Sequence, residues 1–192
     1  AAVTVTTAGG SVDFSSTIDN KSGQTRALNI TSGEGDVGLG STTAHIGTTT
    51  ALGSLTINDA TGDGDGNITL RGNIGSKGDS GAKGAGTVTI GNSATAVLDF
   101  DGTAYNTGAA TYTAVSFTLS GTDPNFITDN LDVTFAGGAS HIVLADASDL
   151  TIDTDDGEGE NGGGNIAIAP QIRGTNGGEA DTTNTVSYTH LR

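Results

Sequence analysis

The sequence contains no cysteine, no methionine and no tryptophan, and only 4% of its 192 residues are aromatic. Without cysteine the chain has no disulfide framework, no cysteine-ligated zinc and no thiol nucleophile. It carries 7 Lys and Arg against 22 Asp and Glu, so it offers no basic surface to a nucleic acid. It also has no run approaching the ~20 consecutive apolar residues of a membrane-spanning helix. The composition therefore argues against disulfide scaffolds, nucleic-acid-binding proteins and helical membrane segments.

Two residue types dominate what is present, with 32 glycines and 32 threonines. Both are poor helix formers, and threonine is favourable in strands. The glycines have no period of three and there are only 2 prolines, which excludes collagen. This composition predicts an all-β chain.

The apolar residues lie in short alternating runs, such as Leu28/Ile30, Leu55/Ile57 and Val115/Phe117/Leu119. Alternation places two or three side chains of each run on one face of a strand. Clusters of Gly, Asp, Asn and Ser separate the runs and favour turns. The pattern predicts many short, closely spaced strands.

A motif recurs within this pattern: Gly, then Ser or Asn, then two apolar residues separated by one position, then Ile four positions later. Copies begin at Gly10, Gly66 and Gly164. Acidic glycine-rich loops precede the last two copies, and each loop follows a similar strand, Leu55-Thr56-Ile57 or Leu150-Thr151-Ile152. The motif predicts a repeated unit of strand, loop, strand and apolar corner, with loops of variable length. His45 and His141, each followed by Ile, would then occupy equivalent repeat positions.

A parallel β-helix suits these short runs, because its coils stack inward Val, Ile, Leu, Ala and Thr side chains in a narrow core. At roughly 20 to 28 residues per coil, the chain would form about seven to nine coils with unpaired strand edges at both ends. A β-sandwich would need larger, often aromatic, inward side chains. Tandem Ig-like β-sandwiches remain the alternative, since Leu55 and Leu150 are separated by about one such domain.

Several segments resemble the repeats of large bacterial surface proteins of the filamentous-haemagglutinin and autotransporter-adhesin type. They are residues 10–19, 26–37, 51–57 and 66–74. The resemblance covers 9–75 well and 125–175 loosely, and 91–124 departs from it. It implies a right-handed β-helical stalk, secreted across the outer membrane and displayed or released, without catalytic residues. It also implies neighbouring coils of the same chain and an unidentified host-surface or matrix ligand, protein or glycan, as partners.

The two ends carry separate signals. The first residues lack the basic and apolar segments of a signal peptide, which indicates the interior of a longer reading frame. The last seven, Val186–Arg192, resemble the translation of a transposase adaptor from shotgun sequencing, as expected of a metagenomic fragment. We therefore expect one β-helical repeat segment over 1–185 and a non-native tail over 186–192. The alternative is a natural strand over 185–188.

Two acidic loops are candidate calcium sites, because calcium takes several hard oxygen ligands in flexible geometry. Neither loop fits the EF-hand or the glycine-rich nonapeptide pattern, so solvated, charge-repelling loops are the alternative. No cofactor other than calcium is expected. The candidate ligands are Asp63, Asp65, Asp153, Asp155, Asp156 and Glu158.

Two other functions have weak signals. Thr-x-Thr pairs begin at residues 4, 48, 87 and 111, and such pairs order water on ice-binding faces only when they form a regular array. The unequal spacing predicts no such array. Asp99, Asp101 and Tyr105 form the nearest approach to a catalytic cluster, but scarce aromatic and basic residues argue against an enzyme.

The favoured hypothesis is a non-enzymatic structural stalk of an extracellular bacterial adhesin. The alternatives are a calcium-rigidified Ig-like or cadherin-like binding repeat and a fragment of a β-helical polysaccharide-degrading enzyme.

Overall fold

The computed structural model describes residues 1–60, 62–77, 82–138, 141–155, 163–174 and 186–189. This part of the chain consists of short strands and turns and contains no helix. It therefore has no helix that is long and apolar enough to span a membrane. The all-β prediction is confirmed.

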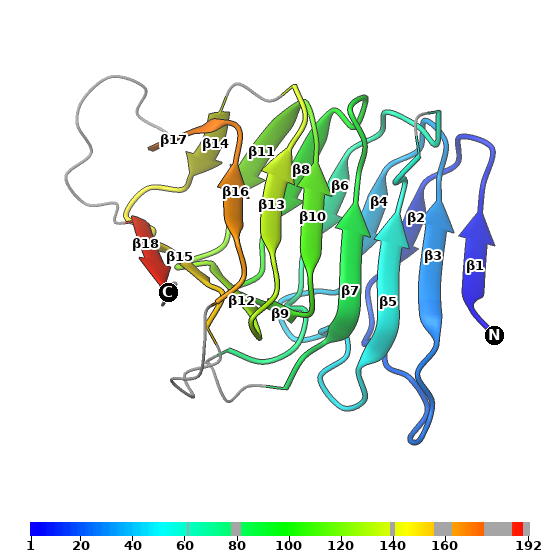
Figure 1. Ribbon diagram of the computed structural model, residues 1–192. Coiled ribbons are helices and arrows are strands. Elements are labelled where there is room, and N and C mark those ends of the chain that lie inside the picture. Colours follow the sequence, from blue (N-terminus) through cyan, green and yellow to red (C-terminus); the bar gives the residue numbers. More distant parts are fainter. Residues whose placement is uncertain (61, 78–81, 139–140, 156–162, 175–185, 190–192) are drawn as a thin grey trace.

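The strands lie in three rows, which we call A, B and C (Figure 1). Row A contains β1 (Val3–Thr6), β3 (Ala27–Thr31), β5 (Leu52–Ile57), β7 (Ala85–Ile90), β10 (Ala110–Thr113), β13 (Val133–Ala136) and β16 (Ile166–Ile168). Row B contains β2 (Val12–Phe14), β4 (Val37–Leu39), β6 (Ile68–Leu70), β8 (Val97–Phe100), β11 (Ser116–Leu119), β14 (His141–Leu144) and β17 (Gln171–Gly174). Row C contains β9 (Ala104–Thr107), β12 (Asn125–Thr128), β15 (Leu150–Asp153) and β18 (Val186–Thr189).

Row C begins with single bridges, which join Ile18 to Ile46, Ile46 to Ile74 and Ile74 to Tyr105 in β9. The chain thus passes from row A to row B to row C and returns to row A one strand further along. Rows A and C belong to one 11-stranded sheet, joined where β7 meets β9, and row B is a separate 7-stranded sheet.

Every strand pair in the described residues is parallel. Partner residues in row A are 22 positions apart from Val88 to Ala110 and 33 apart from Leu55 to Val88. Loops of different length therefore connect strands that keep one register. The alternative of tandem Ig-like sandwiches is wrong for these residues, because such sandwiches are built from antiparallel strands.

The core lies between the three rows and is made of apolar ranks, meaning lines of register-paired residues that cross the strands. Alternate residues of each strand point inward, so a rank collects the same face of every strand. One rank of row A contains Val5, Ile30, Ile57, Ile90, Tyr112, Phe135 and Ile168. One rank of row B contains Val12, Val37, Ile68, Leu98, Phe117, Ile142 and Ile172.

The scarce aromatic residues are concentrated in one part of this core. Phe100 lies at the centre, with its ring centroid 4.9 Å from those of Tyr105 and Tyr112 and 5.0 Å from that of Phe126. Phe135 continues the cluster at 5.2 Å from Phe126 and 5.5 Å from Phe117. The edge-to-face arrangement of most pairs suits the quadrupoles of the rings. The cluster fills the same interior that aliphatic side chains fill elsewhere.

The predicted repeat is correct for two copies and wrong for the third. Val12/Phe14/Ile18 and Ile68/Leu70/Ile74 each run from row B to row C, whereas Ile166/Ile168 belong to row A and Ile172 to row B. The similar segments at Leu55 and Leu150 likewise lie in rows A and C. His45 precedes the row C bridge of Ile46 and His141 begins β14 in row B, so they are not equivalent.

Residues 186–189 form β18, which pairs with β15 through Leu150↔Val186 and Ile152↔Tyr188. This segment thus continues row C as a strand. The adaptor origin of 186–192 and the boundary at residue 185 stay predictions, and residues 190–192 lie outside the described part.

Candidate functional site

A buried polar ladder forms the corner between rows A and B, where the first acidic loop begins. The Ser32 backbone NH donates to Asn58 Oδ1 at 2.8 Å, and Asn58 Nδ2 donates to Ser32 Oγ at 2.9 Å. One strand further along, Asn92 Nδ2 donates to the carbonyl oxygens of Asn58, Ala60 and Gly64 at 2.7, 3.1 and 3.2 Å. Asn58 has φ 43°, a left-handed conformation that asparagine tolerates better than most residues. The ladder therefore fixes the base of the loop from inside.

The candidate ligands Asp63 and Asp65 lie on this loop. The Asp63 carboxylate accepts from the Ala60 NH at 3.0 Å, and the Asp63 NH donates to the Ala60 carbonyl, so this side chain closes its own turn. The side chain of Asp65 is exposed, and its backbone carbonyl accepts from the NH of Ala96, which directly precedes β8. Hydrogen bonds within the protein thus account for the conformation of this loop, and no bound metal ion is needed to explain it.

The second acidic loop follows β15, at the corner between rows C and A. Asp153 Oδ1 accepts from the Asp155 NH at 3.1 Å, and Asp155 is only 7% exposed. Asp156 and Glu158 lie outside the described residues. Because the two loops lie at different corners and are separated by several strands, the structure does not combine them into one site. Within the described residues, no group of three or more Asp, Glu or His side chains is arranged to hold a metal ion.

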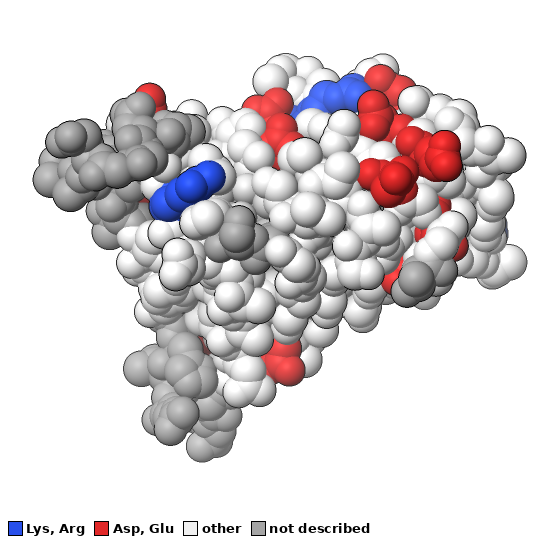
Figure 2. Space-filling model, turned by 90° about the horizontal axis from the view of Figure 1, so that it is seen from above, with Lys and Arg blue, Asp and Glu red and all other residues white. Residues whose placement is uncertain are grey.

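Acidic side chains gather on one half of the face shown in Figure 2, around few cations. That half contains the strands from β1 to β6 (Figures 1 and 2). Clustered exposed carboxylates repel one another and keep a surface hydrated. Calcium binding by the six candidate carboxylates stays a prediction from the sequence.

The outer face of row B carries an ion pair that spans two strand spacings. Arg71 Nη1 and Nη2 donate to Asp13 Oδ1 and Oδ2 at 3.0 and 2.9 Å, and Gly38 lies between the two residues in the row. A Cβ added to Gly38 would lie 1.7 Å from Arg71 Nη2, so the absent side chain makes room for the guanidinium. The hydrogen bond from Arg71 lowers the pKa of Asp13.

Asp99 lies on the same outer face and is half-buried. Burial raises the pKa of Asp99, the hydrogen bond from Ser120 Oγ opposes that rise, and the charge of Asp101 adds to it. A carboxyl group with a raised pKa is a feature of some acid–base sites.

Tyr105 does not join Asp99 and Asp101 in a catalytic cluster. Its side chain is 1% exposed, and its hydroxyl exchanges hydrogen bonds with the Gly102 NH and carbonyl at 2.8 and 3.2 Å. Asp99 instead pairs in register with Thr69 and Thr118 on the outer face of row B. The three residues are neighbours in sequence, but Tyr105 points into the core and is inaccessible to a substrate.

Threonines form a regular rank on the outer face of row A. Thr56 pairs with Thr89, Thr89 with Thr111 and Thr111 with Thr134, so four adjacent strands present a threonine at one position. Asn29 and Ala167 continue the rank on either side. The Thr-x-Thr pairs themselves do not stack, because Thr87 pairs with Ser54 and Thr113 with Ala136, so the prediction of no regular array of pairs agrees with these strands. Loops of unequal length nevertheless bring single threonines into one rank. Threonine suits a half-exposed strand position.

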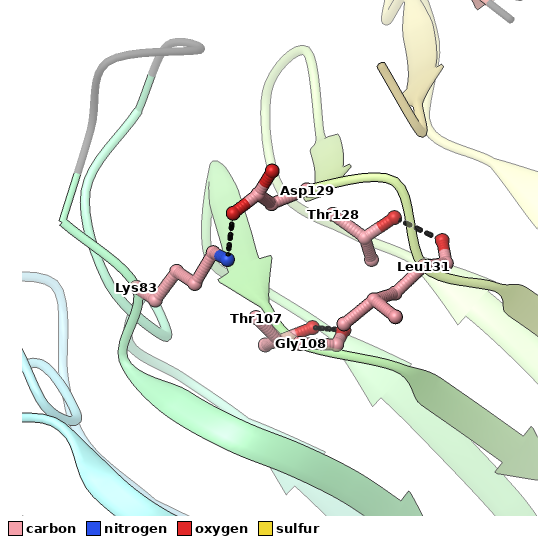
Figure 3. A network of polar contacts seen from close by, with 6 residues as sticks. All are labelled: Lys83, Thr107, Gly108, Thr128, Asp129 and Leu131. Carbon is pink, nitrogen blue, oxygen red and sulfur yellow. Dashed lines mark hydrogen bonds and ion pairs between the residues drawn. The ribbon is translucent and has the colours of Figure 1, made fainter. Parts of the chain in front are cut away.

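The corner between rows C and A contains the polar network drawn in Figure 3. Lys83 Nζ donates to Asp129 Oδ2, and the Thr128 hydroxyl donates to the Leu131 carbonyl. The Thr107 hydroxyl donates to the Gly108 carbonyl at 2.9 Å (Figure 3). The Lys83–Asp129 contact joins two loops, whereas the other two bonds each lie within one loop. None of these contacts has a geometry that points to a reaction. Comparison with protein-family models, curated proteins and solved structures finds no match for this chain.

Proposed function

We propose that the chain is a right-handed parallel β-helix of seven coils that serves as a stalk segment of a secreted or surface-displayed bacterial adhesin. Each coil comprises one strand of row A, one of row B and one position of row C. At about 4.8 Å per coil, seven coils give a rod about 30 to 35 Å long. The proposal rests on the strand register. In each row, equivalent residues of successive strands stay paired from the first strand to the last.

Continuous ranks favour a load-bearing role. Each coil contacts only its neighbours, so length grows by adding coils without redesigning the core. The hydrogen bonds between parallel strands run along the rod, and the buried ladder of Ser32, Asn58 and Asn92 adds side-chain bonds in the same direction. Such a rod can hold a binding region away from a cell surface.

The outer faces suit an extracellular rod. Row A presents threonine hydroxyls, and the corner between rows A and B presents carboxylates, which favour solubility. Variable loops, including residues 75–86, would supply the surface that contacts a host or matrix ligand. The stalk role requires no catalytic group.

Two measurements test the proposal. Small-angle X-ray scattering should be measured on dilute solutions of the chain and of variants in which one coil is duplicated. The data should fit a rod that lengthens by about 4.8 Å for each added coil. Antibodies raised against residues 1–185 should label intact source cells or their culture medium. A maximum dimension that does not grow with each added coil would overturn the rod, whereas labelling only after lysis would overturn surface display and leave the rod intact. Hydrolysis of a glycan by the purified chain would favour the enzyme alternative.

A further inference from the structure

The corner between β11 and β12 contains Pro124, one of only two prolines in the chain, directly after Asp123. Asp123 has φ 49°, a left-handed conformation that is uncommon for a residue with a side chain. The ring of a proline also restricts the residue before it, which then prefers an extended backbone. Asp123 is therefore held in a conformation that both its own side chain and Pro124 disfavour.

The fold imposes this conformation on Asp123. Gly40 and Ala147, at other corners between rows B and C, also have positive φ, of 74° and 54°. The Asp123 NH donates to Ser148 Oγ at 3.0 Å, and Asp123 Oδ1 accepts from the Asp149 NH at 3.0 Å. Two adjacent residues of the corner between β14 and β15 thus hold both the backbone and the side chain of Asp123. Strain that the surroundings enforce in this way is a feature of functional positions.

The chain on the other side of the Asp123–Pro124 bond is held as well. Pro124 is buried, and its carbonyl accepts from the Thr151 NH at 3.1 Å. The Asn125 NH donates to the Thr103 carbonyl at 3.1 Å. Relaxing the backbone on either side of the bond would therefore break hydrogen bonds to neighbouring coils.

We propose that the chain cleaves itself at the Asp123–Pro124 peptide bond. Oδ2 of the Asp123 carboxyl group attacks the carbonyl carbon of Asp123. The C–N bond breaks, its electron pair stays with the Pro124 nitrogen, and the carboxyl proton passes through solvent to that nitrogen. A five-membered cyclic anhydride remains on Asp123, and one water molecule then converts it into two carboxyl groups. The net reaction is hydrolysis of one peptide bond.

The groups at this corner suit these steps. An aspartate carboxylate is an established nucleophile in covalent catalysis, and here it belongs to the same residue as the carbon that it attacks. The proline nitrogen is part of a tertiary amide and accepts a proton more readily than an ordinary peptide nitrogen does. The Asp149 NH holds Oδ1, whereas Oδ2 has no partner among the described residues. Cleavage also frees Asp123 from the restriction that proline places on it.

The two fragments would stay together after cleavage. β11, before the bond, pairs with β14, and β12, after the bond, pairs with β9. Each fragment therefore pairs with the other in both row B and row C. The product should keep its size under native conditions and separate only when it is unfolded. The proposal depends on this corner and not on the stalk function proposed above.

Incubation of the full 192-residue chain tests the proposal, at the lowest pH at which circular dichroism shows the folded state. Mass spectrometry should find the fragments 1–123 and 124–192. Their rate of formation should be about tenfold higher than in the same buffer with urea, because only the folded chain holds Asp123 in place. The bond before the other proline, Ala169–Pro170, has no neighbouring carboxyl group and should stay intact. No cleavage, or cleavage that is no faster in the folded chain, would overturn the proposal.

Two variants at the bond separate the nucleophile from the leaving group. Asp123→Gly tolerates the left-handed conformation but lacks the carboxyl group, and Pro124→Ala keeps the carboxyl group but replaces the tertiary amide. Neither variant should be cleaved. Cleavage of Asp123→Gly at the rate of the parent chain would show that another group breaks the bond, and would overturn the proposal.

Ser148 is a positioning residue in this proposal, and its variants test the role of the fold. Ser148→Ala removes the acceptor of the Asp123 NH, so it should slow cleavage of the folded chain and leave the rate in urea unchanged. Ser148→Thr keeps the hydroxyl group and should restore the rate of the parent chain. Equal rates in the folded parent chain and in folded Ser148→Ala would contradict the positioning role.

Discussion

The guanidinium of Arg71 reaches Asp13 across the bare backbone of Gly38, so one ion pair links the row B segments of three successive coils. The side chains of Arg71 and Asp13 are 34% and 60% exposed. Exposed pairs contribute little to stability, so this pair is better tested by its effect on the pKa of Asp13 than by unfolding.

Replacing Gly38 with alanine should displace Arg71 from Asp13. The new Cβ would overlap the guanidinium, and the pKa of Asp13 should rise toward its ordinary value as the hydrogen bonds are lost. Carboxyl carbon chemical shifts followed by NMR through an acid titration measure this change. Gly138→Ala is the matched control, because nothing lies within 4 Å of a Cβ added there. If the pKa of Asp13 is unchanged in Gly38→Ala, the absence of a side chain at Gly38 is not what lets Arg71 reach Asp13.

Deleting residues 110–132 should remove one complete coil and leave a folded rod. Val133 would then take the place of Ala110, since both pair with their neighbours at the same register position. The shortened chain should unfold cooperatively, with lower stability because Tyr112, Phe117 and Phe126 are lost from the aromatic cluster. Circular dichroism with thermal melting measures both properties.

A deletion of residues 110–133 is the control for that experiment. It differs by one residue and would place Thr134 inward and Phe135 outward, because side chains alternate along a strand. This variant should fail to fold or should aggregate. Equal stability of the two deletions would show that register does not determine the core.

Two buried tyrosines should respond in opposite directions to loss of the hydroxyl group. The Tyr112 hydroxyl is buried without a hydrogen-bond partner, so Tyr112→Phe should raise the free energy of unfolding by up to about 1 kcal/mol. The Tyr105 hydroxyl bonds to Gly102, so Tyr105→Phe should lower it by about 1 kcal/mol. Urea denaturation of both variants measures the difference. A loss of stability in Tyr112→Phe would reveal a partner for that hydroxyl.

Asp99 should make stability depend on pH. Its pKa is raised in the folded chain, so the stability linked to its protonated form is complete below the unfolded pKa and is lost as the pH rises through the folded value. The free energy of unfolding of Asp99→Asn should therefore equal that of the parent chain at low pH and exceed it near neutral pH. Urea midpoints measured across this range give the result.

A control for the Asp99 experiment changes its environment instead. Ser120→Ala removes the hydrogen bond that lowers the Asp99 pKa, so that pKa should rise further. Asp101→Asn removes a repulsive charge and should lower it. Shifts in the reverse directions would refute the electrostatic explanation.

The sequence predicted the strands well because burial imposes a period of two on each of them. Leu28/Ile30 and Leu55/Ile57 were expected to share inward faces, and they pair with one another in row A. The first acidic loop was correctly placed in a turn. The direction of the Asp63 carboxylate, which bonds to Ala60, could not be predicted, because it depends on a loop held from inside by Asn92.

The sequence by itself determined that the chain is all-β, because its glycine, threonine and alternating apolar residues disfavour helices and leave short strands between turns. Only the tertiary structure decided which strands are neighbours. Leu55-Thr56-Ile57 and Leu150-Thr151-Ile152 are identical in sequence, yet they lie in rows A and C. The four threonines from Thr56 to Thr134 are unequally spaced in sequence, yet they form one rank. Pairing depends on core packing and on loop lengths summed over a whole coil, and neither is encoded in a local pattern.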